Sequence, residues 1–218
     1  MTEFEKLKEI CRVAAHERSA CEQGFKALME TQSFADIMRV WRENWDDIYN
    51  SKYADIMAKK IVGVFAEAKD LFHASQVYVN EPAEMGLVIV SSPQQPIEVS
   101  GRAKAYLFTA AEVTARDNAQ VYCRDKEAVV TLRDHAYGHF KDGTARVYDF
   151  SEAKGVFREC HTYNAAEVMA NGGKVVDHGH RRIAAYVDTS VYSDTTRNIE
   201  IGGQALLYPL SEYDNIKE

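Results

Sequence analysis

Proline, cysteine and long hydrophobic runs are all scarce in this 218-residue sequence, which has four prolines and four cysteines. The longest apolar runs, such as residues 87–90, are far too short to span a bilayer, so we expect no membrane contact. A basic start followed by an apolar segment is also lacking, which predicts no secretory signal and a cytoplasmic location. In that compartment cysteines are expected to remain reduced thiols. They are Cys11, Cys21, Cys123 and Cys160.

Positive charge is also in short supply. The 26 Lys and Arg residues are outnumbered by 33 Asp and Glu residues, which gives a formal net charge of −7. Because an acidic chain is repelled by phosphate backbones and anionic lipid, we expect no direct binding to nucleic acid. The 46% hydrophobic content is nevertheless that of a folded protein.

The N-terminal part of the chain has the periodicity of helices. Ser33 with Asp36 fits the start of one helix. The apolar side chains that follow recur at steps of three and four residues, and they are Phe34, Ile37, Trp41, Trp45 and Ile48. Such a stripe predicts a helix with one buried face. We therefore expect a helical N-terminal region, 1–76, that caps whatever follows it.

The next region, 77–210, contains an internal repeat. Alanines spaced eight or nine residues apart each begin a short segment in which apolar and polar residues alternate, and they are Ala103, Ala111, Ala119, Ala128, Ala136, Ala145 and Ala153. Short alternating strands without hairpin signals, and without proline between Ile97 and Tyr208, favour a β-solenoid. Two strands and two turns give a coil of about 17 residues. The sequence thus predicts an α+β protein, with a tail at 211–218.

Stacking the coils at this period predicts columns of side chains. An inward column should contain Leu107, Cys123, Phe140 and Phe157, with the two phenylalanines in contact. Acidic residues recur near the ends of the strands, where we interpret them as turn formers. They are Asp117, Asp125, Asp134, Asp142 and Glu159.

Several stretches resemble a group of uncharacterised small β-solenoid proteins from gut bacteria and their phages and mobile elements. They are Cys-Glu-Gln-Gly-Phe-Lys-Ala-Leu at 21–28, Ile-Met-Arg-Val-Trp at 37–41 with Trp45, and repeats such as Ala-Arg-Asp-Asn-Ala-Gln-Val at 115–121. The resemblance covers most of the chain. It implies a helical front with a solenoid behind it, and it supplies no catalytic residues. It also suggests an inhibitor of a bacterial defence complex, such as an anti-CRISPR protein.

Two segments carry residue types that catalysis or metal binding requires. Asp177, His178 and His180 could ligate zinc or copper, but no second ligand pair stands at a recognised spacing, so we interpret them as an exposed loop. Cys160 and His161 are neighbours on a strand and should point to opposite faces, which disfavours a nucleophile–base pair. We therefore expect no metal, no cofactor and no enzymatic activity.

A binding surface is the better expectation. Arg124, Lys141 and Arg158 are equally spaced, one expected coil apart, and should stack in one basic column, with Asp125, Asp142 and Glu159 stacked beside it. These columns could form a salt ladder that stabilises the solenoid, or they could contact a partner. The same wall should carry exposed tyrosines and a histidine, which are common interface residues. The predicted binding surface is Tyr122, Arg124, Tyr137, His139, Lys141 and Arg158.

These observations leave three classes of function. The first is binding to another protein, including a nucleoprotein complex. The second is a structural solenoid that self-assembles into homo-oligomers, and the third is a carbohydrate-active β-helix enzyme. We favour the first, because the periodic acids are explained by turns.

Overall fold

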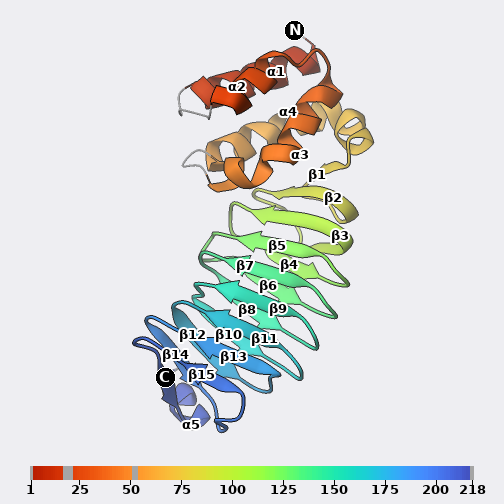
Figure 1. Ribbon diagram of the computed structural model, residues 1–218. Coiled ribbons are helices and arrows are strands. Elements are labelled where there is room, and N and C mark those ends of the chain that lie inside the picture. Colours follow the sequence, from red (N-terminus) through yellow and green to blue (C-terminus); the bar gives the residue numbers. More distant parts are fainter. Residues whose placement is uncertain (1, 17–21, 51–53, 217–218) are drawn as a thin grey trace.

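The computed structural model describes residues 2–16, 22–50 and 54–216. Helices occupy the N-terminal part, and a long stack of strands extends away from them to a short helix at the far end (Figure 1). The helices are α1 (Glu3–His16), α2 (Glu22–Met29), α3 (Phe34–Asn50), α4 (Ala54–Ala74) and α5 (Leu210–Asp214). Within these ranges, no helix is both long enough and apolar enough to span a membrane.

The strands form a parallel β-solenoid with two strands in each coil, which confirms the predicted fold class. Before the coils come β1 (Val77–Val79) and β2 (Ala83–Val90). The first wall contains β3 (Ile97–Leu107), β5 (Gln120–Cys123), β7 (Tyr137–Phe140), β9 (Glu152–Gly155), β11 (Glu167–Ala170), β13 (Arg182–Ala185) and β15 (Ile199–Ile201). The second wall contains β4 (Glu112–Ala115), β6 (Val129–Leu132), β8 (Thr144–Val147), β10 (Glu159–Thr162), β12 (Gly173–Asp177), β14 (Thr189–Tyr192) and β16 (Leu206–Tyr208).

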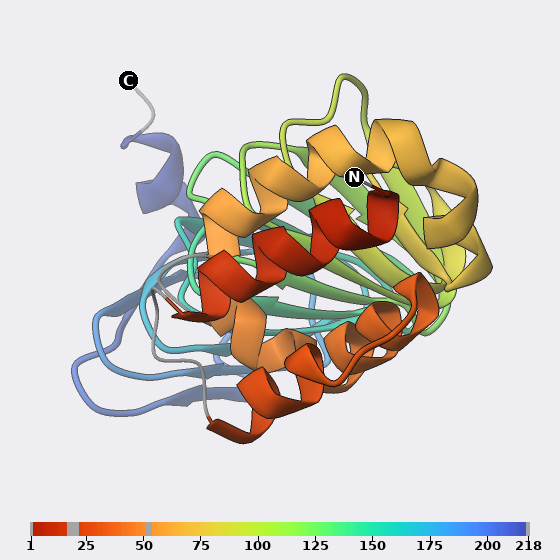
Figure 2. The same cartoon turned by 90° about the horizontal axis from the view of Figure 1, so that it is seen from above.

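The helical region covers the N-terminal end of the solenoid (Figure 2). Trp41 and Trp45 are buried on the inner face of α3, and Phe72 of α4 lies against Trp41. The same apolar cluster continues through β1 and β2 to Tyr106 and Phe108. The predicted cap is therefore joined to the solenoid by one hydrophobic core.

The register of the strands shows where individual coils depart from a uniform period. Val121 is aligned with Gly138, at the expected interval, but Gly138 is aligned with Ala153, which comes two residues earlier than that interval requires. The next coils on the first wall, from Ala153 to Val168 and then to Ile183, are equally short. These coils are shorter because the corners after β7, β9 and β11 each contain fewer residues than the corner after β5.

The shorter coils change the predicted inward column. Leu107, Cys123 and Phe140 are aligned as expected, but the next position is occupied by Gly155. Phe157 lies beyond β9, in the corner before β10. Its buried ring still contacts Phe140, with the ring centroids 5.0 Å apart, so the predicted contact is confirmed although the alignment is not.

Four successive corners that lead from the second wall back to the first each contain a left-handed residue. The φ angles of Asp117, Asp134, Asp149 and Asn164 lie between 57° and 65°. Asp and Asn tolerate this conformation better than most residues, which explains why acids recur there. Asp117 and Asp134 are thus turn residues as predicted, whereas Glu159 is not, because it lies within β10.

The solenoid ends differently at its C-terminal side. Helix α5 lies against the outer face of the second wall, where Tyr213 contacts Tyr192 and Val176. Among the described strands, β15 and β16 are the ends of the sheet order, so no further coil covers the last one. As a result Ile201, aligned with the inward Ala185, is 38% exposed.

Candidate functional site

Part of the predicted binding surface contacts the helical region. Arg124 donates a hydrogen bond to the carbonyl oxygen of Tyr49 at 2.6 Å, and Lys141 donates one to Asn50 Oδ1 at 2.6 Å. The ring of Tyr122 has an edge contact with the ring of Tyr49. These three residues therefore join the first wall to the end of α3.

The tyrosines expected on the outside are also partly covered. Tyr106 is only 2% exposed, because Trp45 and Tyr49 lie against it and its hydroxyl donates a hydrogen bond to Asp46 at 2.5 Å. Tyr122 stacks on Tyr106 with centroids 4.5 Å apart. The sequence placed Tyr122 on the outward surface but gave no sign that α3 covers this part of the wall.

The predicted basic column is broken at its third member. Arg124 and Lys141 directly follow Cys123 and Phe140, which are aligned, so these two cations are neighbours. Arg158 lies in the corner before β10, where it forms an ion pair with Glu127 at 2.9 Å. Because Gly155 is aligned with Phe140, the residue next to Lys141 in the following coil is Val156.

A small cavity of about 200 Å³ lies at the junction between α3 and the first wall. It is lined by Asp46, Tyr49, Asn50, Tyr122, His139 and Lys141. Burial, and then the ammonium groups of Lys154 and Lys141, lower the pKa of His139, so this imidazole is neutral at pH 7. The cavity is large enough for one side chain of a partner.

Next to this cavity the first wall is open, and its outer face carries apolar and cationic side chains together. Val156 and Met169 are 42% and 44% exposed, and the ammonium group of Lys154 lies 5.2 Å from the ring centroid of Tyr137. Lys154 is aligned with His139 on one side and Met169 on the other. We call this surface the wall patch. It consists of Tyr137, His139, Lys141, Lys154, Val156 and Met169.

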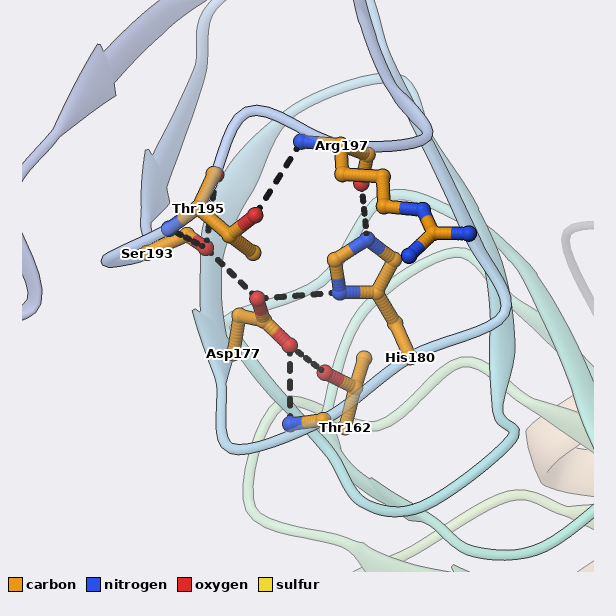
Figure 3. A network of polar contacts seen from close by, with 7 residues as sticks. Thr162, Asp177, His180, Ser193, Thr195 and Arg197 are labelled. Carbon is orange, nitrogen blue, oxygen red and sulfur yellow. Dashed lines mark hydrogen bonds and ion pairs between the residues drawn. The ribbon is translucent and has the colours of Figure 1, made fainter.

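The prediction of an exposed loop is correct for His178 but wrong for the side chains of Asp177 and His180. The side chains of Asp177 and His180 are 4% and 5% exposed and lie within hydrogen-bonding distance, with Oδ2 and Nδ1 2.9 Å apart (Figure 3). Ser193 Oγ donates to the same oxygen at 2.6 Å, and Thr162 and the Gly179 amide donate to the other oxygen. Asp177 thus links three successive coils.

A polar hollow of about 800 Å³ lies beside this network. One side is formed by Asn164 and residues 177–180, and the other by the loop 193–198 with Leu210. The two sides are joined where His180 Nε2 meets the carbonyl oxygen of Arg197 at 2.8 Å. His180 Nε2 faces a backbone carbonyl, and the Ser193 hydroxyl faces the Asp177 carboxylate. Asp177, His180 and Ser193 therefore lack the serine–histidine contact of a catalytic triad.

His178 belongs to a separate histidine pair. Its Nε2 and His161 Nδ1 are 3.1 Å apart, and His161 Nε2 contacts Glu159 Oε1 at 2.5 Å. A hydrogen bond between two ring nitrogens needs a donor and an acceptor, so one of these nitrogens carries no proton. The predicted metal candidates His178 and His180 therefore belong to different networks.

The thiols of the described cysteines are buried. Burial raises the pKa of Cys11 and of Cys123 to about 12, and it raises the pKa of Cys160 as well. A thiol so hard to ionise is a poor nucleophile. Cys21 lies outside the described residues. Among the residues that the structure covers, no group of three or more His, Cys, Asp and Glu side chains is arranged to hold a metal ion.

Comparison with protein-family models, with curated proteins and with solved structures gives no match to this chain.

Proposed function

We propose that this protein acts without catalysis, by binding another protein through the wall patch. The observation that carries the proposal is the group of exposed apolar side chains, Val156 and Met169, beside Tyr137 and two lysines on a rigid sheet. Protein interfaces are enriched in Tyr and Met. Strands held on both sides by neighbouring coils also lose little conformational freedom on binding.

The chemistry of the patch indicates the kind of partner. Lys141 and Lys154 supply positive charge on a chain whose net charge is −7, and Met169 and Val156 supply apolar area. A protein surface with acidic groups around an apolar centre would complement it. The resemblance to proteins of mobile elements suggests a bacterial defence complex, such as a CRISPR nuclease with its guide RNA, as the first target to assay.

The double variant Lys154→Glu with Met169→Glu tests this proposal. It reverses one charge and places another in the apolar centre, so we expect the affinity for the partner to fall more than tenfold, or by about 1.4 kcal/mol. The partner is first captured from host lysate with the wild-type chain, and its affinity is then measured with purified components.

The matched control is Arg146→Glu with Val187→Glu, which reverses one exposed charge and replaces one exposed apolar side chain outside the wall patch. This variant should retain wild-type affinity. Equal binding by both folded variants would move the interface away from the wall patch. Equal loss in both would indicate that only the overall charge matters.

Self-association is a second candidate function, favoured by the open C-terminal coil. Ile201 belongs to the inward column but is 38% exposed, and β15 and β16 each have one edge that no described strand pairs with. Such edges readily pair with another strand. Because helices cover the opposite end, pairing through this end would give a dimer and not a filament.

Light scattering during gel filtration, over a wide concentration range, tests self-association. We expect the wild-type mass to rise with concentration and Ile201→Lys to remain monomeric. Phe150→Lys is the control, because Phe150 is 55% exposed but distant from the last coil in sequence. A wild-type mass that stays monomeric throughout would exclude this candidate.

A further inference from the structure

We propose that the Asp177–His180 pair is a pH-sensitive latch that holds the loop 193–198 against the preceding coil and sets the width of the polar hollow. Both ring nitrogens of His180 face oxygen acceptors: Asp177 Oδ2 at 2.9 Å and the carbonyl oxygen of Arg197 at 2.8 Å (Figure 3). Only the doubly protonated ring can donate to both. The closed loop therefore requires an imidazolium.

Loss of one proton from the His180 ring removes one of its two hydrogen bonds. The ring keeps its hydrogen bond to the carboxylate, which is the stronger acceptor, so Nε2 presents a lone pair to the Arg197 carbonyl oxygen. Two acceptors 2.8 Å apart repel each other, and the His180 side chain is too buried for water to intervene without movement of the loop. The loop must then shift away from His180.

Other contacts hold the two ends of the loop. Ser193 is fixed by Asp177, and the amide of Ile183 donates to the carbonyl oxygen of Asn198. Between these points Asp194 Oδ1 accepts a hydrogen bond from the Leu210 amide, which is not part of the preceding coil, and the Arg197 amide donates to Thr195 Oγ1 within the loop. The His180–Arg197 contact is thus the cross-link that holds the middle of the loop to the preceding coil, and its loss widens the hollow.

The charged and titratable groups around the ring come from three directions. Asp177 belongs to β12, His178 and Arg181 flank the ring in its own turn, and Asp194 and Arg197 belong to the loop. From the preceding coil, the residues that face this network are the uncharged Thr162 and Asn164.

Asp177 remains ionised near neutral pH, so its protonation does not open the latch there. Burial opposes its ionisation, but the hydrogen bonds from Ser193 and His180 outweigh burial and lower its pKa. A carboxyl with a lowered folded-state pKa contributes stability above its unfolded value and loses it only as the pH falls through the folded value. The latch therefore opens as the pH rises, when His180 loses its proton.

Nuclear magnetic resonance on the full chain tests the latch. The protonation of the His180 ring and the exchange of the Thr195–Asn198 amides are followed from about pH 5 to about pH 9. After correction for intrinsic exchange, we expect these amides to exchange at least about tenfold faster once His180 is neutral, with the same midpoint as the ring. Amides that stay protected while the ring titrates would overturn the proposal.

Two variants separate the latch from general effects of pH. His180→Gln has no side-chain group that titrates in this pH range, so the exchange of its loop should not depend on the protonation of residue 180. His135→Gln changes an exposed histidine in the corresponding turn between β6 and β7 and should keep the wild-type pH response. A loop in His180→Gln that still responds to pH as the wild type does would also contradict the latch. The wild-type titration decides the question if His180→Gln does not fold.

Discussion

Gly155→Ala is expected to destabilise the solenoid by about 4 kcal/mol or more, enough to reduce the yield of folded protein. Gly155 has a φ of +130°, which residues with a Cβ atom rarely adopt. A Cβ at this position would lie 1.8 Å from the carbonyl oxygen of Phe140 on the neighbouring strand. Neither atom can yield without separating β9 from β7.

The strain at Gly155 is expected to spread along the stack. The Val156 amide donates to the Phe140 carbonyl oxygen, and the Gly155 carbonyl oxygen accepts from Asn171 in the next coil. Moving the strand to relieve the clash would weaken both bonds. Since each coil is stabilised by its neighbours, the defect should also loosen the coils on either side.

The control for this prediction is Gly63→Ala. Gly63 lies on the exposed side of α4, and nothing is within 4 Å of where its Cβ would be. Alanine should therefore stabilise the helix by about 0.5–1 kcal/mol. Thermal unfolding followed by circular dichroism compares the two. A Gly155→Ala protein with a wild-type melting temperature would contradict the close approach of β9 to β7 at this position.

The fold was predictable because its signal is repeated along the chain. Each short strand alternates buried side chains with more exposed ones, as in β1, β5, β6 and β7. Because the alternating pattern recurs in every coil, the solenoid can be recognised even where one coil is irregular. The helical front was equally clear, because Trp41 and Trp45 lie on one stripe and are both buried.

The alignment of the coils was less predictable, because corners can lose residues without changing the strand pattern. Phe157 follows Phe140 at the same interval at which Phe140 follows Cys123, and the sequence offered no reason to end the series. Gly155 gave no warning either, because Gly138 stands at the same place, two residues before Phe140. Arg158 was misplaced for the same reason.

The sites depended on contacts that a repeat cannot reveal. Tyr122, Arg124 and Lys141 were correctly placed on the outside of the first wall, but α3 reaches them from about 75 to 90 residues away in sequence. Lys154 and Met169 were missed because the assumed period placed them outside the basic column. The burial of Asp177 follows from Ser193 in the next coil, a pairing 16 residues apart within the less regular part of the repeat.

Phe140→Ala is expected to cost about 3–5 kcal/mol, because it leaves a cavity in the centre of the solenoid. Phe140 is 1% exposed, and its ring contacts Phe157. For a chain of this length, that loss corresponds to a fall in melting temperature of roughly 6–20 °C. Phe150→Ala removes the same side chain from a position that is 55% exposed and should change stability by no more than about 0.5 kcal/mol.

Gly138 provides an internal check on the cause of that loss. A Cβ at Gly138 would lie 2.6 Å from the Phe140 ring and 2.7 Å from a methyl group of Leu132, so Gly138→Ala alone should be destabilising. In the double variant with Phe140→Ala the first clash disappears and the new methyl group enters the cavity. The two changes should therefore cost less together than the sum of their separate effects. Additive losses, or a Phe140→Ala protein as stable as Phe150→Ala, would mean that Phe140 and Gly138 do not share one packed volume inside the coil.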